Sequence, residues 1–260
     1  MLPLSFKEYM AFTNEHNHGD EKLAFNHYLE FGGLPTVVEL LDRPETIGDF
    51  LEGIYNTVLL KDVVDRNNIR DTALLESVLK FVAANVGNIV STKKISDYLT
   101  SSGRKVTSET IDNYLRMLEN AFIIYKANRF DLKGKQYLKT LEKYYIVDIG
   151  IRNKLTGLRN TDLGHVLENV VYLELIRRGY DITIGKIGTL EVDFVATKTS
   201  EKIYYQVSAS ILDPSTRERE LRPLQAISDN YPKVILTMDQ MPFDDYEGIN
   251  VENIINFLLR

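Results

Sequence analysis

The chain has 260 residues, 44% of them hydrophobic, so it can bury a sizeable core spread over about one to three domains. It has no cysteine, which excludes disulfides and cysteine zinc sites and fits a reducing cytoplasm. No apolar run reaches about 18 residues and no signal peptide is evident, so we expect a cytoplasmic protein without a membrane role. The formal net charge of −6 argues against a protein that coats nucleic acid.

Positive charge is concentrated in the middle of the chain. Residues 67–148 carry 13 basic and 9 acidic side chains, whereas residues 1–66 carry 5 and 12, and residues 149–260 carry 13 and 16. We expect three domains with these boundaries. Contacts to a polyanion such as DNA are therefore expected in the middle domain.

The first expected domain, residues 1–66, has the pattern of several short amphipathic helices without strands. One of these helices ends at Gly32 and Gly33, where a positive φ costs little. No phosphate-binding GxxxxGK(S/T) loop occurs in the chain, and the nearest run, around Gly185, lacks the required spacing and hydroxyl residue. We therefore expect no ATP binding by this chain alone.

The middle domain has the order of elements found in a winged helix-turn-helix. Helices are predicted over 74–87, 91–103 and 107–120, and a two-stranded hairpin follows them. Apolar residues recur every three or four positions in the third helix, which predicts one buried stripe. The stripe consists of Ile111, Tyr114, Leu115 and Leu118.

Acidic residues dominate the solvent face of that third helix, which disfavours its insertion into the DNA major groove. The face consists of Glu109, Asp112, Asn113, Arg116 and Glu119. Basic residues lie along the hairpin instead, and we expect them to contact phosphates without reading sequence. They are Lys126, Arg129, Lys133, Lys135 and Lys139. The alternative is a domain that docks a protein and keeps these lysines solvated.

Two elements of the last expected domain, residues 149–260, place carboxylates where a metal could bind. A helix is predicted over 162–180, and Glu168 projects from its largely apolar face, where an unpaired carboxylate is costly. In the strand predicted over 190–197, alternation puts Leu190, Val192, Phe194 and Ala196 on one face and Glu191 with Asp193 on the other. We expect Glu168, Glu191 and Asp193 to bind Mg²⁺ or Mn²⁺. The alternative for Glu168 is a structural ion pair.

The order of these residues resembles the restriction-endonuclease-like, or PD-(D/E)XK, fold. Its signature is a helical Glu, a strand Asp and then Glu-x-Lys on the following strand. The strand predicted over 203–210 has Gln206 and Ser208 at the last two positions. The resemblance therefore implies a degenerate catalytic site formed by Glu168, Asp193, Gln206 and Ser208. Loss of one electrostatic donor typically slows such a reaction by about 10²–10³-fold.

A catalytic base supplied from another element would keep the site active, and Lys186, Lys202 and Arg217 are candidates for it. The helix predicted over 213–231 carries further charges, for which we expect an exposed network of i, i+4 pairs with Glu218 and Glu220. The alternative is that its arginines contact a phosphate; they are Arg217, Arg219 and Arg222. An active site would make the chain a Mg²⁺- or Mn²⁺-dependent DNase, which is the first alternative to a degenerate nuclease. The second alternative is a protein-interaction module.

Segments along the whole chain resemble a family of prokaryotic AAA-type ATPases that carry a C-terminal domain of unknown function. They are LPLSFKEY near the start, FGGLP at 31–35, KYYIVDIGIRN at 143–153, GHVLEN at 164–169 and EVDFVA at 191–196. The resemblance implies an ATPase-lid-like segment (1–66), a winged helix (67–148) and a restriction-endonuclease-like domain (149–260), without the nucleotide-binding core. It also implies an ATPase core or another protein as a partner.

Together these features predict a mixed α/β fold with a helical segment followed by a winged helix, and the resemblance implies that the last domain is restriction-endonuclease-like. We expect a nucleic-acid-associated or regulatory module of an AAA-type ATPase, with an inactive nuclease fold. The expected partner is DNA, and Mg²⁺ or Mn²⁺ is the one kind of cofactor that the residues suggest.

Overall fold

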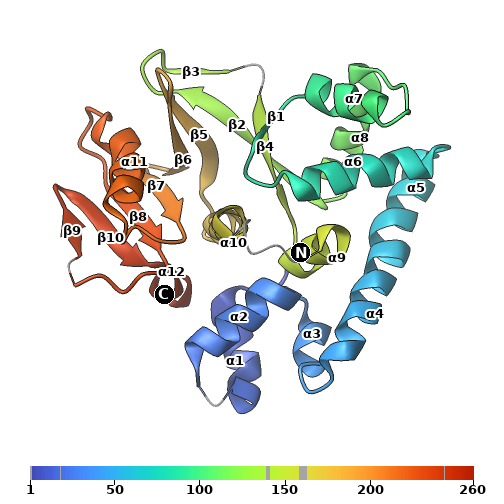
Figure 1. Ribbon diagram of the computed structural model, residues 1–260, viewed down its shortest axis with the longest axis horizontal. Helices are drawn as coiled ribbons and strands as arrows, with labels where there is room; N and C mark the ends of the chain where they lie inside the picture. The colour runs from blue at the N-terminus through green and yellow to red at the C-terminus, as the bar shows by residue number, and fades with distance from the viewer. Residues whose placement is uncertain (1, 18, 139–140, 158–162, 243) are drawn as a thin grey trace. The chain divides into compact units, whose positions relative to one another are not determined.

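The computed structural model describes residues 2–17, 19–138, 141–157, 163–242 and 244–260 (Figure 1). The chain forms two compact units. The first contains Met1–Lys126 and Glu142–Leu158, and the second contains Ala127–Leu141 and Arg159–Arg260. Both units combine helices with strands, which confirms the predicted α/β class. These units differ from the three expected domains, because the expected helical segment (1–66) and most of the expected middle domain (67–148) belong to one unit.

The first unit begins with a series of short helices. They are α1 (Phe6–Asn17), α2 (Glu21–Phe31), α3 (Pro35–Glu39), α4 (Pro44–Ile54), the π-helical turn η1 (Tyr55–Leu60) and α5 (Lys61–Asn67). The side chain of Asp20 caps α2 by accepting the N–H groups of Lys22 and Leu23. As predicted, α2 ends at Gly32, whose φ of 84° is readily adopted by glycine.

Buried hydrogen bonds join the end of α2 to the start of α9 (Ile149–Thr156). Asp148 caps α9 by accepting the N–H of Ile151 at 3.0 Å, and its other oxygen accepts the N–H of Gly33 at 2.8 Å. Asn153 donates to two carbonyl groups in the last turn of α2, each at 2.9 Å. Burial raises the pKa of the Asp148 carboxyl to about 6, although backbone N–H groups act in the opposite direction. The FGGLP segment (31–35) and the DIGIRN segment (148–153) are therefore held together by hydrogen bonds, and we call this contact the α2–α9 joint.

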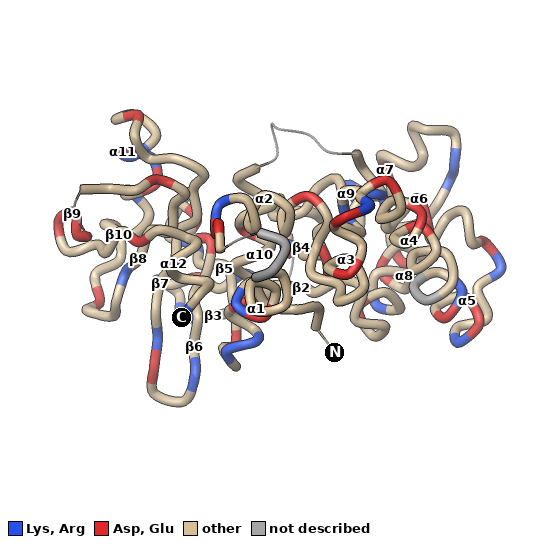
Figure 2. The backbone as a smooth tube through the Cα atoms, turned by 90° about the horizontal axis from the view of Figure 1, so that it is seen from below, with Lys and Arg blue, Asp and Glu red and all other residues tan. Residues whose placement is uncertain are grey.

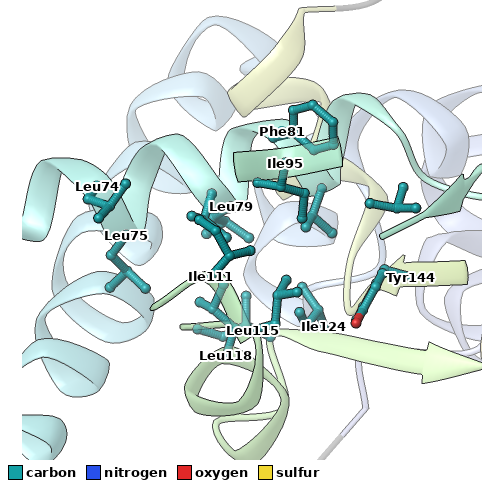
Figure 3. Close-up of a cluster of buried hydrophobic side chains, with 14 of the residues drawn as sticks. Leu74, Leu75, Leu79, Phe81, Ile95, Ile111, Leu115, Leu118, Ile124 and Tyr144 are labelled. Carbon is teal, nitrogen blue, oxygen red and sulfur yellow. The ribbon is translucent and has the colours of Figure 1, made fainter. Parts of the chain in front are cut away.

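Three further helices enclose the main core of the first unit. These are α6 (Thr72–Ala84), α7 (Thr92–Ser101) and α8 (Ser108–Asn120), which pack with β1 (Ile89–Val90), β4 (Glu142–Ile146) and the beginning of β2 (Ile124–Asp131). The side chains of Asp71, Ser91 and Thr107 cap the three helices. Figure 3 shows the core, which includes Leu75, Leu79, Ile95, Ile111, Leu115, Leu118, Ile124 and Tyr144.

The stripe predicted for α8 is confirmed. Ile111, Leu115 and Leu118 are buried, and Tyr114 is half-buried against the same core. Burial of each aliphatic side chain stabilises the fold by roughly 1.5–3 kcal/mol. The periodicity of the helix therefore fixes which side of α8 faces the core and which residues remain on its solvent face.

The second unit is built on a mixed sheet in the order β2-β5-β6-β7-β8-β10-β9, with β3 paired to β2. Its remaining strands are β3 (Gln136–Tyr137), β5 (Asp181–Ile187), β6 (Leu190–Lys198), β7 (Glu201–Ser208), β8 (Lys233–Thr237), β9 (Asp245–Tyr246) and β10 (Ile249–Asn253). β2 is parallel to β5, β7 is parallel to β8 and β10, and β6 is antiparallel to both of its neighbours. The carboxyl ends of β2, β5, β7, β8 and β10 therefore meet at one edge, the usual position of a site in such sheets.

Helices cover both faces of this sheet (Figure 1): α10 (Leu163–Arg177), α11 (Pro214–Gln225) and α12 (Ile254–Leu259). Leu221 of α11 belongs to a buried cluster with Val195 of β6. The next residue back along β6, Phe194, points to the other face and has its ring centroid 5.9 Å from that of Tyr172 in α10. In the part of the chain that the structure describes, no helix is long and apolar enough to cross a membrane.

Candidate site at the carboxyl edge of the sheet

Asp193 lies at a bulge in β6. Gly185 pairs with Val192 but Thr183 pairs with Val195, so β6 has one residue more than β5 between these pairs. The predicted alternation is therefore wrong in part. Val192 and Val195 share one buried cluster, whereas Phe194 packs on the opposite face. The extra residue in β6 shifts the alternation by one position beyond Asp193.

The side chains of Asp193 and Gln206 continue the contact between β6 and β7 where the described ladder ends. That ladder runs from Lys198 paired with Glu201 to Phe194 paired with Tyr205. Beyond it, the N–H of Asp193 donates to Oε1 of Gln206 at 3.3 Å, and Oδ2 of Asp193 accepts the N–H of Val207 at 2.9 Å. Both side chains are buried. Side-chain oxygens thus satisfy two buried backbone donors at this end of the strands.

Glu220 of α11 completes this network. Nε2 of Gln206 donates to Oε2 of Glu220 at 2.9 Å, and Arg219 donates to the other carboxylate oxygen at 3.1 and 2.8 Å. Glu220 is buried, so the exposed charge network predicted for it is wrong. The burial of Glu220 could have been predicted from its position one helical turn before Leu224, an apolar residue that is fully buried.

Gln206 and Ser208 are both engaged with protein groups. The two partners of the Gln206 amide fix its orientation. Its oxygen must face the N–H of Asp193, which can only donate, and its nitrogen must face the carboxylate of Glu220, which can only accept. Ser208 donates to the carbonyl of Ser210 at 2.9 Å. At these two positions the site therefore has neither the carboxylate nor the amine that a nuclease of this signature uses.

The three candidates for a relocated base lie in different places. Lys202 is at the other end of β7, where its Nζ is 3.2 Å from Asp229. Arg217 lies over the ring of Tyr246 at 5.6 Å. Lys186 lies at the same edge of the sheet as Asp193, paired in register with Glu191.

Glu168 is buried in α10, as its apolar surroundings in the sequence predict, and His165 Nδ1 lies 3.7 Å from its carboxylate. Among the residues that the structure describes, no three His, Asp or Glu side chains gather closely enough to hold a metal ion. The expected ligands Glu168, Glu191 and Asp193 do not form such a group. A role for them in binding Mg²⁺ or Mn²⁺ stays a prediction.

The five basic residues expected to contact nucleic acid differ in accessibility. Lys133 and Lys135 are exposed, and Lys126 is half-buried with its Nζ 3.8 Å from Glu119. Arg129 lies on β2 in register with the buried Ile184 of β5 and is only 8% exposed, and its Nε has no hydrogen-bond partner among the residues that the structure describes. The expected surface contact by Arg129 is therefore corrected. Lys139 lies outside the described residues.

Charges of both signs are interspersed along the chain, as Figure 2 shows. On the exposed face of α8, Arg116 is bound to Asp112 and Asn113, each at 2.9 Å, so the one cation of that face is neutralised locally. The exposed lysines of the β2–β3 turn are different. Neither Lys133 nor Lys135 has an ion-pair partner among the described residues.

A model of a domain of unknown function (DUF8612) matches residues 22–162, which is more than half of the chain. The chain belongs to this family. The match includes the α2–α9 joint and the β2–β3 turn, and it ends before the Asp193–Gln206–Glu220 network.

Two curated relatives match nearly the whole chain. An "Uncharacterized protein" of Haemophilus influenzae is 40% identical over 264 residues, covering 100% of this chain. "Uncharacterized protein MJ1544" of Methanocaldococcus jannaschii is 30% identical over 279 residues, covering 99% of this chain. The chain spans only 64% and 61% of the lengths of these relatives. No solved structure matches it significantly.

Proposed function

We propose that the chain is a nucleic-acid-associated regulatory module that does not cut its ligand. In this proposal α6, α7, α8 and the β2–β3 turn act as a winged helix, and the second unit is a degenerate restriction-endonuclease-like domain. The observation that carries the proposal is the hydrogen bonding of Gln206. It stands where the signature requires a carboxylate, and it holds the Asp193 N–H and the Glu220 carboxylate in a closed, buried network.

The β2–β3 turn supports nucleic-acid contact without sequence reading. Lys133 and Lys135 are exposed and can approach phosphates. The solvent face of α8 is acidic, and Arg116 is already bound to Asp112, so α8 is a poor reader of the major groove. Binding is therefore proposed to be electrostatic, weak at high salt and indifferent to base sequence.

The module is proposed to work in the cytoplasm with an AAA-type ATPase core. Because the chain has no phosphate-binding loop, ATP would have to be bound outside it. The curated relatives are longer than this chain, which is compatible with a nucleotide-binding part beyond the region they share. The ATPase relationship rests on the sequence resemblance alone.

A gel-shift and cleavage experiment tests the proposal. Labelled linear and branched DNA is incubated at low salt with Mn²⁺ and the wild-type chain, Asp193→Ala, or the double variant Lys133→Glu/Lys135→Glu. A charge-matched control, Lys22→Glu/Lys61→Glu, changes two exposed lysines of the first unit. We expect the wild-type chain to shift the DNA without cleaving it. The double variant Lys133→Glu/Lys135→Glu should lose the shift, whereas the control and Asp193→Ala should keep it.

A Mg²⁺- or Mn²⁺-dependent DNase is the second candidate, and the position of Glu220 favours it. Its buried carboxylate lies 2.9 Å from Gln206 and could supply the negative charge that Gln206 lacks. This candidate requires metal-dependent cleavage that is lost in both Asp193→Ala and Glu220→Gln. Cleavage unaffected by either variant would point to a contaminating nuclease.

A protein-interaction module is the third candidate, and exposed apolar residues of the first unit favour it. Phe12 of α1 is 62% exposed and Leu23 of α2 is 43% exposed. This candidate predicts no DNA shift at any salt concentration. It also predicts that Phe12→Ser weakens the association with a purified partner ATPase core.

A further inference from the structure

We propose that the β2–β3 turn binds an unpaired base by stacking it on Tyr137, with Lys133 and Lys135 on the neighbouring phosphates. This inference rests on the proposed nucleic-acid function and names the form of ligand that the turn recognises: a single strand, or the unpaired end of a duplex. Three observations carry it. They are the exposure and support of one aromatic ring, the fixed shape of the turn, and the position of its charges.

Tyr137, the second residue of β3, presents an aromatic ring to solvent beside the β2–β3 turn. The residue is 65% exposed, the largest exposed fraction among the large hydrophobic residues whose exposure the structure describes. The ring is held by Phe130, its register partner on β2, with centroids 5.3 Å apart and planes at 73°. Such edge-to-face packing favours this orientation of the Tyr137 ring. An exposed ring that is supported from one side can stack on an unpaired base.

The backbone between the two strands has a defined shape. Oδ1 of Asp131 accepts the N–H groups of Lys133 and Gly134, both at 3.0 Å. Lys135 adopts a left-handed φ of 51° that returns the chain to β3. Hydrogen bonding to these N–H groups lowers the pKa of Asp131. The Asp131 carboxylate is therefore charged at neutral pH and accepts hydrogen bonds from the backbone of the turn. The turn thus holds one lysine on each side of Gly134.

Charge complementarity selects a nucleic acid as the occupant. Residues 133–137 are all exposed and carry two positive charges and no negative one. The chain as a whole has a net charge of −6, so its total charge does not attract a polyanion, whereas the positive charge concentrated at this turn does. Inside a duplex the faces of the bases are covered by their neighbours, whereas an unpaired base has a face on which a ring can stack. The combination of one ring and two lysines therefore favours unpaired over fully paired DNA.

Fluorescence anisotropy of the full chain at low salt tests the inference. The probes are a labelled blunt duplex, the same duplex with a single-stranded overhang, and the overhang duplex with abasic sugars in the overhang. The variants are Tyr137→Ala, Tyr137→Phe and Lys133→Glu/Lys135→Glu. Phe12→Ala serves as a control because it removes a ring of similar exposure, 62%, from the first unit.

We expect the wild-type chain to bind the overhang about 10-fold more tightly than the blunt or abasic probe, which corresponds to one stacked base. Tyr137→Ala should abolish this preference, while Tyr137→Phe and Phe12→Ala should retain it. A general loss of folding cannot imitate this outcome, since it would weaken all three probes equally.

Two results would overturn the inference in distinguishable ways. If the wild-type chain binds all probes equally, or if Tyr137→Ala keeps the preference, stacking is absent. The nucleic-acid function then still stands, provided that the lysine variant loses binding. If the wild-type chain binds no probe at low salt, the proposed function and the inference both fail.

Discussion

The amide of Gln206 donates to the carboxylate of Glu220 at 2.9 Å, and this bond joins β7 to α11 beneath the surface of the second unit. It is a charge-assisted hydrogen bond between a neutral donor and a buried anion. The oxygen of the same amide accepts the N–H of Asp193. One side chain therefore satisfies a carboxylate and a backbone donor, so a substitution at Gln206 affects both.

Restoring the signature carboxylate with Gln206→Glu should destabilise the protein in the absence of metal. The variant loses the donor to Glu220 and places two carboxylates about a hydrogen-bond length apart, at a cost of roughly 1–3 kcal/mol. Thermal unfolding with and without Mn²⁺ measures the effect. We expect a lower Tm without metal and a larger Mn²⁺-dependent rise than in the wild type. A variant as stable as the wild type, with no response to Mn²⁺, would contradict the network described here.

Asp193 should be needed for stability whether or not the chain cuts DNA. Asp193→Ala leaves the buried N–H of Val207 without its acceptor, which costs about 1–3 kcal/mol. Asp193→Asn retains an oxygen at that position and should be closer to the wild type in urea unfolding. Equal loss in both variants would mean that the negative charge, and not the acceptor, is what the fold requires. Asp193→Asn is therefore the sharper variant for an activity test.

Stability should depend on the protonation of Asp148. Its pKa is raised from an ordinary value of 3.8 to about 6, so the folded state binds a proton more tightly than the unfolded state. The stabilisation of the folded state by this proton is fully present below about pH 3.8 and is lost as the pH rises through about 6. A pKa shift of this size corresponds to roughly 3 kcal/mol in the free energy of unfolding.

Urea unfolding from pH 4 to pH 7 measures the Asp148 contribution against Asp148→Asn. The variant should lack this part of the pH dependence. It should also be less stable at every pH, because its NH₂ group would face either the N–H of Gly33 or that of Ile151. The N-cap variant Asp20→Asn is the control, and it should change stability little. Parallel pH profiles for the wild type and Asp148→Asn would contradict the assignment.

Gly150 should not tolerate a side chain. A Cβ at this position would clash with the carbonyl oxygen and carbon of Phe31, both backbone atoms. We expect Gly150→Ala to lose several kcal/mol or to fail to fold, since the α2–α9 joint would have to open. Gly48→Ala is the matched control. It lies within α4, where an added Cβ meets nothing within 4 Å, and it should stabilise the protein by about 0.5–1 kcal/mol.

The spacing of apolar residues predicted the helices well. It could not predict which strands pair when they lie far apart in the sequence. The α8 stripe depends on residues within a few positions of one another. The burial of Arg129 depends on β5, which lies about fifty residues further along the chain, and single-sequence patterns do not specify strand partners.

The candidate site was predicted in part for the same reason. Glu168 and Asp193 were correctly expected on a helix and a strand, and Gln206 on the next strand. The bulge at Asp193 was missed because it breaks the alternation that the strand prediction assumed. Glu220 was missed because its charged neighbours on α11 gave it the pattern of a solvent-exposed residue, although α11 turns it toward Gln206.

The most direct test of the central claim compares the wild-type chain with Asp193→Asn on labelled branched DNA at low salt with Mn²⁺, analysed on native and denaturing gels. We predict that both proteins retard the DNA on the native gel and that the DNA remains intact on the denaturing gel. Metal-dependent cleavage by the wild type that Asp193→Asn abolishes would contradict the account and establish an active nuclease. A complete absence of retardation would contradict the nucleic-acid function itself.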